Sequence, residues 1–278
     1  MPDELLTEAI LEATRDLDRR SAREILELIH AEDLVAAQAV GGVLGAIERA
    51  VEVLVLVLQG GGRWFNVGAG TSGRMGVLDA AEIPPTFGYP AERVQAIQAG
   101  GFEAVWHARE GVEDDAAAAR EQLRSRELMP GDAVVAISAS GYTPFTLAAL
   151  EEASKVGARR IAISCNADSP LSRLAEVAIT PEVGPEVIAG STRMKGGLAQ
   201  KMVLHLLSTT VMVRLGRVEG NQMTNLVPAS RKLEGRALRI LSTLGGIDEQ
   251  RARKLLRECH GSVQEALARL RAAPTKGT

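Results

Sequence analysis

The sequence predicts an α/β protein in which a parallel β-sheet is sandwiched between helices, with further helices at both ends of the chain. Three observations lead to this class. Short β-prone runs alternate with helical stretches through the middle of the chain. One of these runs, residues 133–137, is almost continuously apolar, as strands buried on both faces of a parallel sheet are. Outside residues 59–218 the pattern is helical.

The N-terminal segment, residues 1–58, is expected to be helical. Ser21 and Glu24 have the spacing of a capping box, which marks the start of a helix. Helical periodicity follows, with a polar break expected at Glu32 and Asp33. A second helix is expected over residues 34–58, and its last two turns are apolar nearly all round. Such a helix must be buried against more than one element, and a second subunit can provide part of that cover.

The central segment, residues 59–218, contains the expected sheet. Its strands are placed at residues 63–67, 93–99, 133–137, 161–163 and 177–179. The helices between them are placed at residues 75–81, at 114–127, after Pro144, and from about 192 to 215. Pro84 and Pro85 are expected to close the first of these helices, which puts Glu82 at its end.

The C-terminal segment, residues 219–278, is expected to form a small helical module. Two short amphipathic patterns occur between residues 241 and 272, around the pairs Gly245-Gly246 and Gly261-Ser262. No strand pattern is present in this segment.

Composition excludes several classes of function. Of the 278 residues, 46% are hydrophobic and 24% are charged, as in an ordinary soluble globular protein. A net charge of −3 and only 3% aromatic residues disfavour nucleic-acid binding. The most apolar stretch, residues 51–58, is interrupted by Glu52 and is far shorter than the roughly 20 residues that span a bilayer. No membrane contact is therefore expected.

Cysteine usage and the first residues of the chain favour a cytoplasmic location. Cys165 and Cys259 lie far apart and outside any Cys/His cluster, so neither a disulfide framework nor a metal site is expected. The acidic N-terminus does not have the basic start of a signal peptide.

Two loops of similar design carry the candidate binding site. Residues 68–74 read GAGTSGR and residues 138–144 read SASGYTP, and each follows an expected strand and precedes an expected helix. Backbone N–H groups and small hydroxyls at such positions converge on an anion, so a phosphate is expected there. The candidate ligands are Thr71, Ser72, Ser138, Ser140 and Thr143. The alternative, glycines that serve only as tight turns, stays open for either loop alone.

These loops resemble the two phosphate-binding loops of the SIS, or sugar isomerase, domain. Three longer segments resemble the N-acetylmuramic acid 6-phosphate etherases, a family built on that domain. They are GAGTSGRMGVLDAAEIPPTFG at residues 68–88, EVIAGSTRMKGGLAQ at 186–200 and GRVEGN at 216–221. The resemblance extends over nearly the whole chain. It implies an SIS-type fold, a homodimer, and a phosphorylated amino sugar as substrate.

The implied reaction cleaves the ether between C3 of the sugar and its D-lactyl group, without a cofactor. It needs a base at C2 and an acid at the ether oxygen. Motif by motif, the resemblance assigns the acid to Glu82 and the base to Glu113. The apolar neighbours Ile83 and Phe87 suit an acid whose pKa must be raised. From the residues alone, Glu82 also fits an exposed carboxylate at a helix end, and Glu113 fits an acidic helix start.

A second family segment supplies further candidate contacts to the sugar or the lactyl group. They are Glu186, Ser191, Arg193 and Lys195, of which Lys195 also fits an ordinary surface charge.

Two other functions remain open at this point. A non-catalytic phosphosugar sensor, like the glucokinase regulatory protein, does not require both Glu82 and Glu113. An aldose–ketose isomerase moves a proton between C2 and C1 and releases no lactate.

Overall fold

The computed structural model describes residues 5–226, 228 and 230–272. The chain forms two compact units. The first consists of Met1–Ala80 and Glu92–Val211, and the second of Ala81–Ala91 and Met212–Thr278. Within the described residues, no helix is both long enough and apolar enough to cross a membrane.

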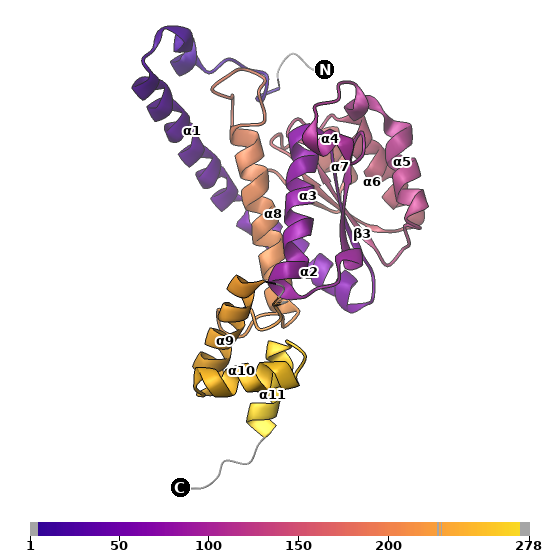
Figure 1. Ribbon diagram of the computed structural model, residues 1–278. Coiled ribbons are helices and arrows are strands. Elements are labelled where there is room, and N and C mark those ends of the chain that lie inside the picture. Colours follow the sequence, from indigo (N-terminus) through magenta and orange to yellow (C-terminus); the bar gives the residue numbers. More distant parts are fainter. Residues whose placement is uncertain (1–4, 227, 229, 273–278) are drawn as a thin grey trace. The chain divides into compact units, whose positions relative to one another are not determined.

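The first unit is built on a five-stranded parallel sheet with strand order β2-β1-β3-β4-β5 (Figure 1). The strands are β1 (Trp64–Gly68), β2 (Val94–Gln98), β3 (Ala133–Ile137), β4 (Arg159–Ile163) and β5 (Val177–Ile179). All five predicted strands are confirmed, with boundaries that shift by at most two residues.

Helices cover both faces of this sheet (Figure 1). On one face, α5 (Ala116–Ser125), α6 (Pro144–Val156) and α7 (Pro170–Leu174) pack over a core that contains Phe65 and Val134. On the other face lie α3 and α8 (Lys195–Arg214). The predicted α/β sandwich is therefore confirmed.

Two long helices precede the sheet, after the short 3-10 turns η1 (Glu12–Thr14) and η2 (Leu17–Arg19). The capping box is confirmed, because the Ser21 hydroxyl accepts from the Glu24 amide and the Glu24 carboxylate accepts from the Ser21 amide. The predicted break at Glu32 and Asp33 is wrong. Helix α1 (Ala22–Gly42) continues through both residues, and α2 (Leu44–Gln59) begins only after Val43. Glu32 is tolerated there because it pairs with the ammonium of Lys195.

Helix α3 (Gly70–Phe87) differs most from its prediction. It begins directly after β1 and includes both Pro84 and Pro85. The prolines remove two backbone donors, yet the helix continues because the Gly88 amide donates to the carbonyl of Pro84 (2.9 Å). Glu82 therefore lies inside the helix rather than at its end.

The connection from β2 to α5 is irregular. It contains the single-turn helix α4 (Glu103–Trp106) and the 3-10 turn η4 (Val112–Asp114), while the 3-10 turn η3 (Ala91–Arg93) precedes β2. Helix α5 begins two residues later than predicted, because the Asp115 carboxylate caps it by accepting from the Ala118 amide (2.9 Å).

Between residues 230 and 272 the second unit forms three helices, where the sequence predicts two amphipathic patterns. They are α9 (Arg231–Gly245), α10 (Glu249–Glu258) and α11 (Val263–Ala272). These helices share an apolar core of their own that includes Leu241, Leu256 and Leu267. The predicted helical module is confirmed as far as residue 272; residues 273–278 lie outside the described part of the chain.

Candidate functional site

The two hydroxyl-rich loops meet at the carboxyl edge of the sheet. Strands β1 and β3 are neighbours, with Gly68 paired to Ile137, so the loops that follow them lie side by side. Together they line a cavity of about 370 Å³, called the loop cavity below. Its lining includes Thr71, Ser72, Ser138, Ser140, Thr143 and Glu113. All five predicted phosphate ligands and the predicted base are thus brought together in one place.

The first loop leads into α3 without an intervening turn. Because α3 begins at Gly70, the amides of its first turn have no earlier helical carbonyl to bind. Thr71 and Ser72 stand on that turn and are half-buried. The start of α3 therefore offers hydroxyls and free amides to the loop cavity, which is the arrangement an anion requires.

The second loop is held in shape by its own hydroxyls. The Ser138 hydroxyl accepts a hydrogen bond from the Gly141 amide (3.0 Å) and lies 2.8 Å from the Thr143 hydroxyl. The Tyr142 amide donates to the Ser140 hydroxyl (3.2 Å). Gly141 adopts a φ of +75°, and a Cβ there would lie 2.3 Å from the Ser169 hydroxyl oxygen. The loop conformation consequently requires glycine at this position.

The third wall of the loop cavity comes from the segment between β2 and α5. It supplies the half-buried carboxylate of Glu113, together with Arg109 and Glu110. Arg109 and two other lining residues, Arg74 and Gln98, are not among the site residues that the sequence predicts. The signal for Arg74 was its place at the end of the first loop, and for Gln98 its place at the last position of β2.

Gln98 contributes an unusual polar atom to this site. Its side chain is only 5% exposed, and its Oε1 has no hydrogen-bond partner within the described residues. The Nε2 atom donates to the carbonyl of Ala99 (3.3 Å). The Oε1 atom packs against the backbone of the first loop, because a Cβ added at Gly73 would collide with it.

Glu82 is placed differently from its prediction. It is not among the residues that line the loop cavity, and its side chain is exposed. The apolar enclosure expected around it is not found in the described chain, because Ile83 and Phe87 turn inward and are buried while Glu82 points outward. Successive helical residues are about 100° apart, so a buried neighbour does not bury Glu82.

Glu186 and Lys195 have partners within the protein. The two carboxylate oxygens of Glu186 accept from the amides of Lys195 and Gly196, each at 2.9 Å, and so cap the start of α8. The ammonium of Lys195 is buried and pairs with Glu32 on α1. Both side chains hold α8 in place and lie outside the lining of the loop cavity. Lys195 is therefore not the surface charge that the sequence left open.

Ser191 and Arg193 also lie outside that lining, whereas Thr192 between them belongs to it. Arg193 is exposed and Ser191 is half-buried. In the family segment at residues 186–200, the residue that lines the loop cavity is therefore Thr192, which is not one of the predicted site residues.

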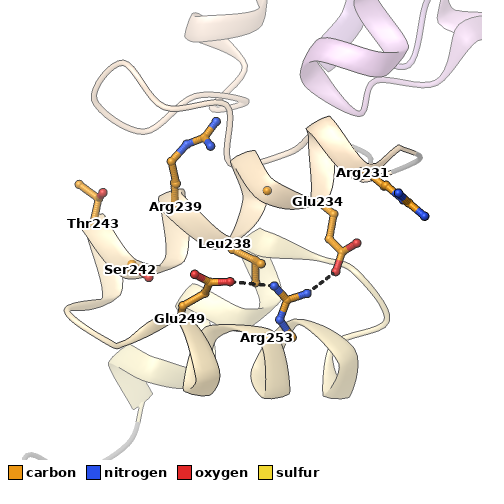
Figure 2. Close-up of a pocket in the computed structure, with 9 residues that line it drawn as sticks. Arg231, Glu234, Leu238, Arg239, Ser242, Thr243, Glu249 and Arg253 are labelled. Atoms are coloured by element: carbon orange, nitrogen blue, oxygen red, sulfur yellow. Dashed lines mark hydrogen bonds and ion pairs between the residues drawn. The ribbon is translucent and has the colours of Figure 1, made fainter.

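A larger hollow, of about 770 Å³, lies in the second unit between α9 and α10 (Figure 2). Arg253 crosses it and bonds to Glu234 (3.0 Å) and to Glu249 (2.8 Å). Two carboxylates thus already neutralise this guanidinium. None of the predicted site residues lies there, so the loop cavity is the candidate functional site.

Comparisons with known proteins assign the family. The SIS domain profile matches residues 115–210, and the profile of the glucokinase regulatory protein N-terminal SIS domain matches residues 46–154. The N-acetylmuramic acid 6-phosphate etherase of Symbiobacterium thermophilum is 48% identical over 96% of this chain and 88% of its own length. The chain belongs to the N-acetylmuramic acid 6-phosphate etherase family.

Other members of the etherase family agree with this assignment. The Geobacillus thermodenitrificans etherase is 44% identical over 96% of this chain and 90% of its own length. Among solved structures, a putative phosphosugar isomerase from Bacteroides fragilis matches with a TM-score of 0.54 and 23% identity, covering 72% of this chain and 93% of its own. The phosphoheptose isomerase of Neisseria gonorrhoeae matches with a TM-score of 0.51 and 17% identity, over 69% and 98%. These two matches show the SIS fold.

Proposed function

We propose that this protein is an N-acetylmuramic acid 6-phosphate etherase, a carbon–oxygen lyase in the recycling of cell-wall amino sugars. The proposal rests on membership of the etherase family together with one structural observation. Both hydroxyl-rich loops and the Glu113 carboxylate line the same cavity, which supports the proposal that one substrate molecule reaches an anion site and a base there. The products are N-acetylglucosamine 6-phosphate and D-lactate.

The 6-phosphate is assigned to the two loops. The amides at the start of α3, with the hydroxyls of Thr71 and Ser72, meet it from one side. Ser140 and Thr143 meet it from the other. Hydrogen bonds to an anion are the strong ones, so this end of the substrate provides most of the affinity.

Glu113 is assigned as the base. In the open-chain sugar the C1 carbonyl acidifies the C2 proton, and the Glu113 carboxylate removes it. The electron pair left at C2 forms the C2–C3 double bond as the C3–O bond breaks, and an acid protonates the departing lactyl oxygen. Water then adds to C3, and a proton returns to C2. Because Glu113 is half-buried, it can lie next to substrate while keeping contact with solvent.

Glu82 is assigned as the acid, on the family motif alone. Its exposed position leaves it free to contact a ligand or another subunit.

We also propose a homodimer, because α1 buries only Ala36 and Val40 over its 21 residues and leaves Leu26 and Leu34 exposed. We propose a cytoplasmic location as well, because the proposed recycling reaction fits that compartment. The two cysteines, both free thiols, agree with it.

The deciding experiment is incubation with N-acetylmuramic acid 6-phosphate and an assay for D-lactate. We expect stoichiometric lactate from the phosphorylated sugar and very little from unphosphorylated N-acetylmuramic acid. Binding without lactate would favour a phosphosugar sensor, the alternative suggested by the match to the glucokinase regulatory protein domain. Interconversion of aldose and ketose phosphates without lactate would favour an isomerase.

A further inference from the structure

Arg74 connects two walls of the loop cavity. It is the last residue of the first loop, stands in the second turn of α3 and lines the cavity. Its guanidinium donates through Nη2 to the carbonyl of Ala104 (2.8 Å) and through Nε to the carbonyl of Val105 (3.0 Å). Both carbonyls belong to α4, about thirty residues further along the chain. Arg74 thus lies beside the expected anion site, but its guanidinium donates hydrogen bonds to the backbone of α4, on another wall of the cavity.

The two carbonyls lack helical partners of their own. Helix α4 is a single turn, and the chain leaves helical conformation at His107, so no following helical amide reaches Ala104 or Val105. Arginine fits this pair because its planar fork presents several N–H groups in a fixed arrangement. A lysine ammonium at the same place would reach one of the carbonyls as a single point charge.

From α4 the contact continues to Glu113. Gly100 has a φ of +79°, and a Cβ placed there would lie 3.1 Å from the Ala104 Cβ and 3.1 Å from the Val112 Cγ1. Ala104 and Val112 therefore both pack against Gly100. Arg109 braces the same point by donating to the carbonyl of Gly100 (3.2 Å). Residues 100–113, called the wall segment below, are thus held together at Gly100, Ala104 and Val112, and Glu113 follows directly after Val112.

We propose that Arg74 is a positioning residue for the base. It ties the wall segment to the start of α3, so that Glu113 faces C2 of the sugar while the first loop holds the 6-phosphate. This inference rests on the proposed function and assigns one more residue to that site. Val112 also packs against the sheet core, and this contact does not involve Arg74. We therefore expect loss of Arg74 to shift Glu113 without unfolding the unit.

The test compares Arg74→Ala and Arg74→Lys with a matched control, Arg93→Ala. Arg93 also donates to a backbone carbonyl, that of Leu58 (3.2 Å), but lies outside the loop cavity. The readout is exchange of the C2 proton of N-acetylglucosamine 6-phosphate in D₂O, followed by NMR. We expect kcat for exchange to fall about ten- to a hundredfold in Arg74→Ala, as for a base displaced by about 1 Å. KM should stay within about threefold, Arg74→Lys should recover part of the loss, and the control should match wild type.

A double-mutant cycle shows whether Arg74 acts through Glu113. Glu113→Asp keeps a carboxylate but shortens its reach, which leaves a measurable residual exchange. If both residues serve the same step, Arg74→Ala should cost clearly less in the Glu113→Asp background than in wild type. Full additivity would overturn the inference. A large rise in KM with unchanged kcat would also overturn it, because Arg74 would then be a direct phosphate ligand.

A second readout does not depend on activity. Hydrogen–deuterium exchange of the full chain should show faster uptake over residues 100–113 in Arg74→Ala, and not in Arg93→Ala. Unchanged uptake would overturn the inference even if the enzyme is an etherase. Conversely, a wild-type protein that releases no D-lactate would refute the proposed function, and the uptake measurement would still decide whether Arg74 holds the wall segment.

Discussion

Ser138 and Ser140 lie two residues apart in the same loop, yet the structure gives them different tasks. Ser138 is buried and bonds to the Gly141 amide and the Thr143 hydroxyl, so it shapes the loop. Ser140 is half-buried and lines the loop cavity, and its hydroxyl accepts from the Tyr142 amide and lies 3.4 Å from the Ser138 hydroxyl. A spacing pattern alone cannot separate these roles, because it does not show which hydroxyls are already used by the protein.

Removal of one hydroxyl from the anion site should weaken substrate binding. We expect Ser72→Ala and Ser140→Ala each to raise KM for the phosphorylated sugar about tenfold, which corresponds to about 1.4 kcal/mol for one hydrogen bond to an anion. Steady-state kinetics of lactate release give the value. Equal turnover of phosphorylated and unphosphorylated sugar by the wild type would refute the assignment of the loops.

Substitutions of Glu82 and of Glu113 should have different effects on exchange of the C2 proton. If Glu82 protonates the lactyl oxygen, Glu82→Ala blocks ether cleavage but still allows C2 exchange in the product. Glu113→Ala should lose both, with kcat reduced by about 10²–10⁴ as for other losses of acid–base catalysis. NMR of N-acetylglucosamine 6-phosphate in D₂O gives the answer, once circular dichroism has shown that both variants fold. Exchange in the Glu113 variant alone would reverse the two roles.

Asp79 gives the stability of the first unit a pH dependence. Burial raises the pKa of its carboxyl to about 6 from 3.8, against the opposing effects of the Ser208 hydroxyl and of Lys201. The folded chain therefore holds this proton more tightly than the unfolded chain. The resulting stabilisation is complete below about pH 4 and is lost as the pH rises through about 6.

Asp79→Asn should remove this dependence. Relative to the variant, wild type should lose about 3 kcal/mol of unfolding free energy between pH 4 and pH 8, as expected for a pKa shift of about two units. Urea unfolding followed by fluorescence of the buried Trp64 measures the difference. Asp168→Asn is the control, because that side chain is 86% exposed. A difference between wild type and Asp79→Asn that does not change with pH would contradict this account.

At the scale of single elements, the second loop depends on a glycine. Gly141→Ala should lower the melting temperature and raise KM more than tenfold, because Cβ would combine a positive φ, costing about 1–2 kcal/mol, with a collision against Ser169. Gly157→Ala separates the effect of the positive φ from the effect of the collision. Its φ is +85°, but the nearest atom to its Cβ would be Pro130 Cβ at 3.9 Å. This control should lose stability without a change in KM, and a similar KM in both variants would refute the role of the loop.

The sequence predicts the elements of this fold well wherever local pattern decides them. Apolar runs placed all five strands, and the Ser21 capping box placed the start of α1. Local pattern is not sufficient where contacts with a distant segment of the chain determine the structure. Glu32 looked like a break because its partner Lys195 lies 163 residues away. Likewise, nothing in the local sequence shows that the Glu186 carboxylate accepts from the amides at the start of α8; a contact of Glu186 with substrate stays a prediction.

At the scale of the whole molecule, α1 is the surface through which we propose that two chains associate. Leu26 and Leu34 are 63% and 53% exposed on a helix that buries only two residues of its own. Burial of one leucine contributes about 1.5–3 kcal/mol, so a second copy that covers this helix gains substantially from each. The wild-type protein should therefore have twice the 29.5 kDa mass of one chain at micromolar concentration.

A single charge on α1 should disrupt that association. Leu34→Lys should weaken the dimer about ten- to a hundredfold, because the ammonium loses hydration at the interface and the leucine contact is lost. Met129→Lys is the matched control, since Met129 is also 53% exposed but lies on the loop before β3. Light scattering over a dilution series measures the dissociation constant, and lactate release is assayed on the same samples. A wild-type monomer with full activity would show that neither the exposed leucines nor the catalytic site needs a second subunit.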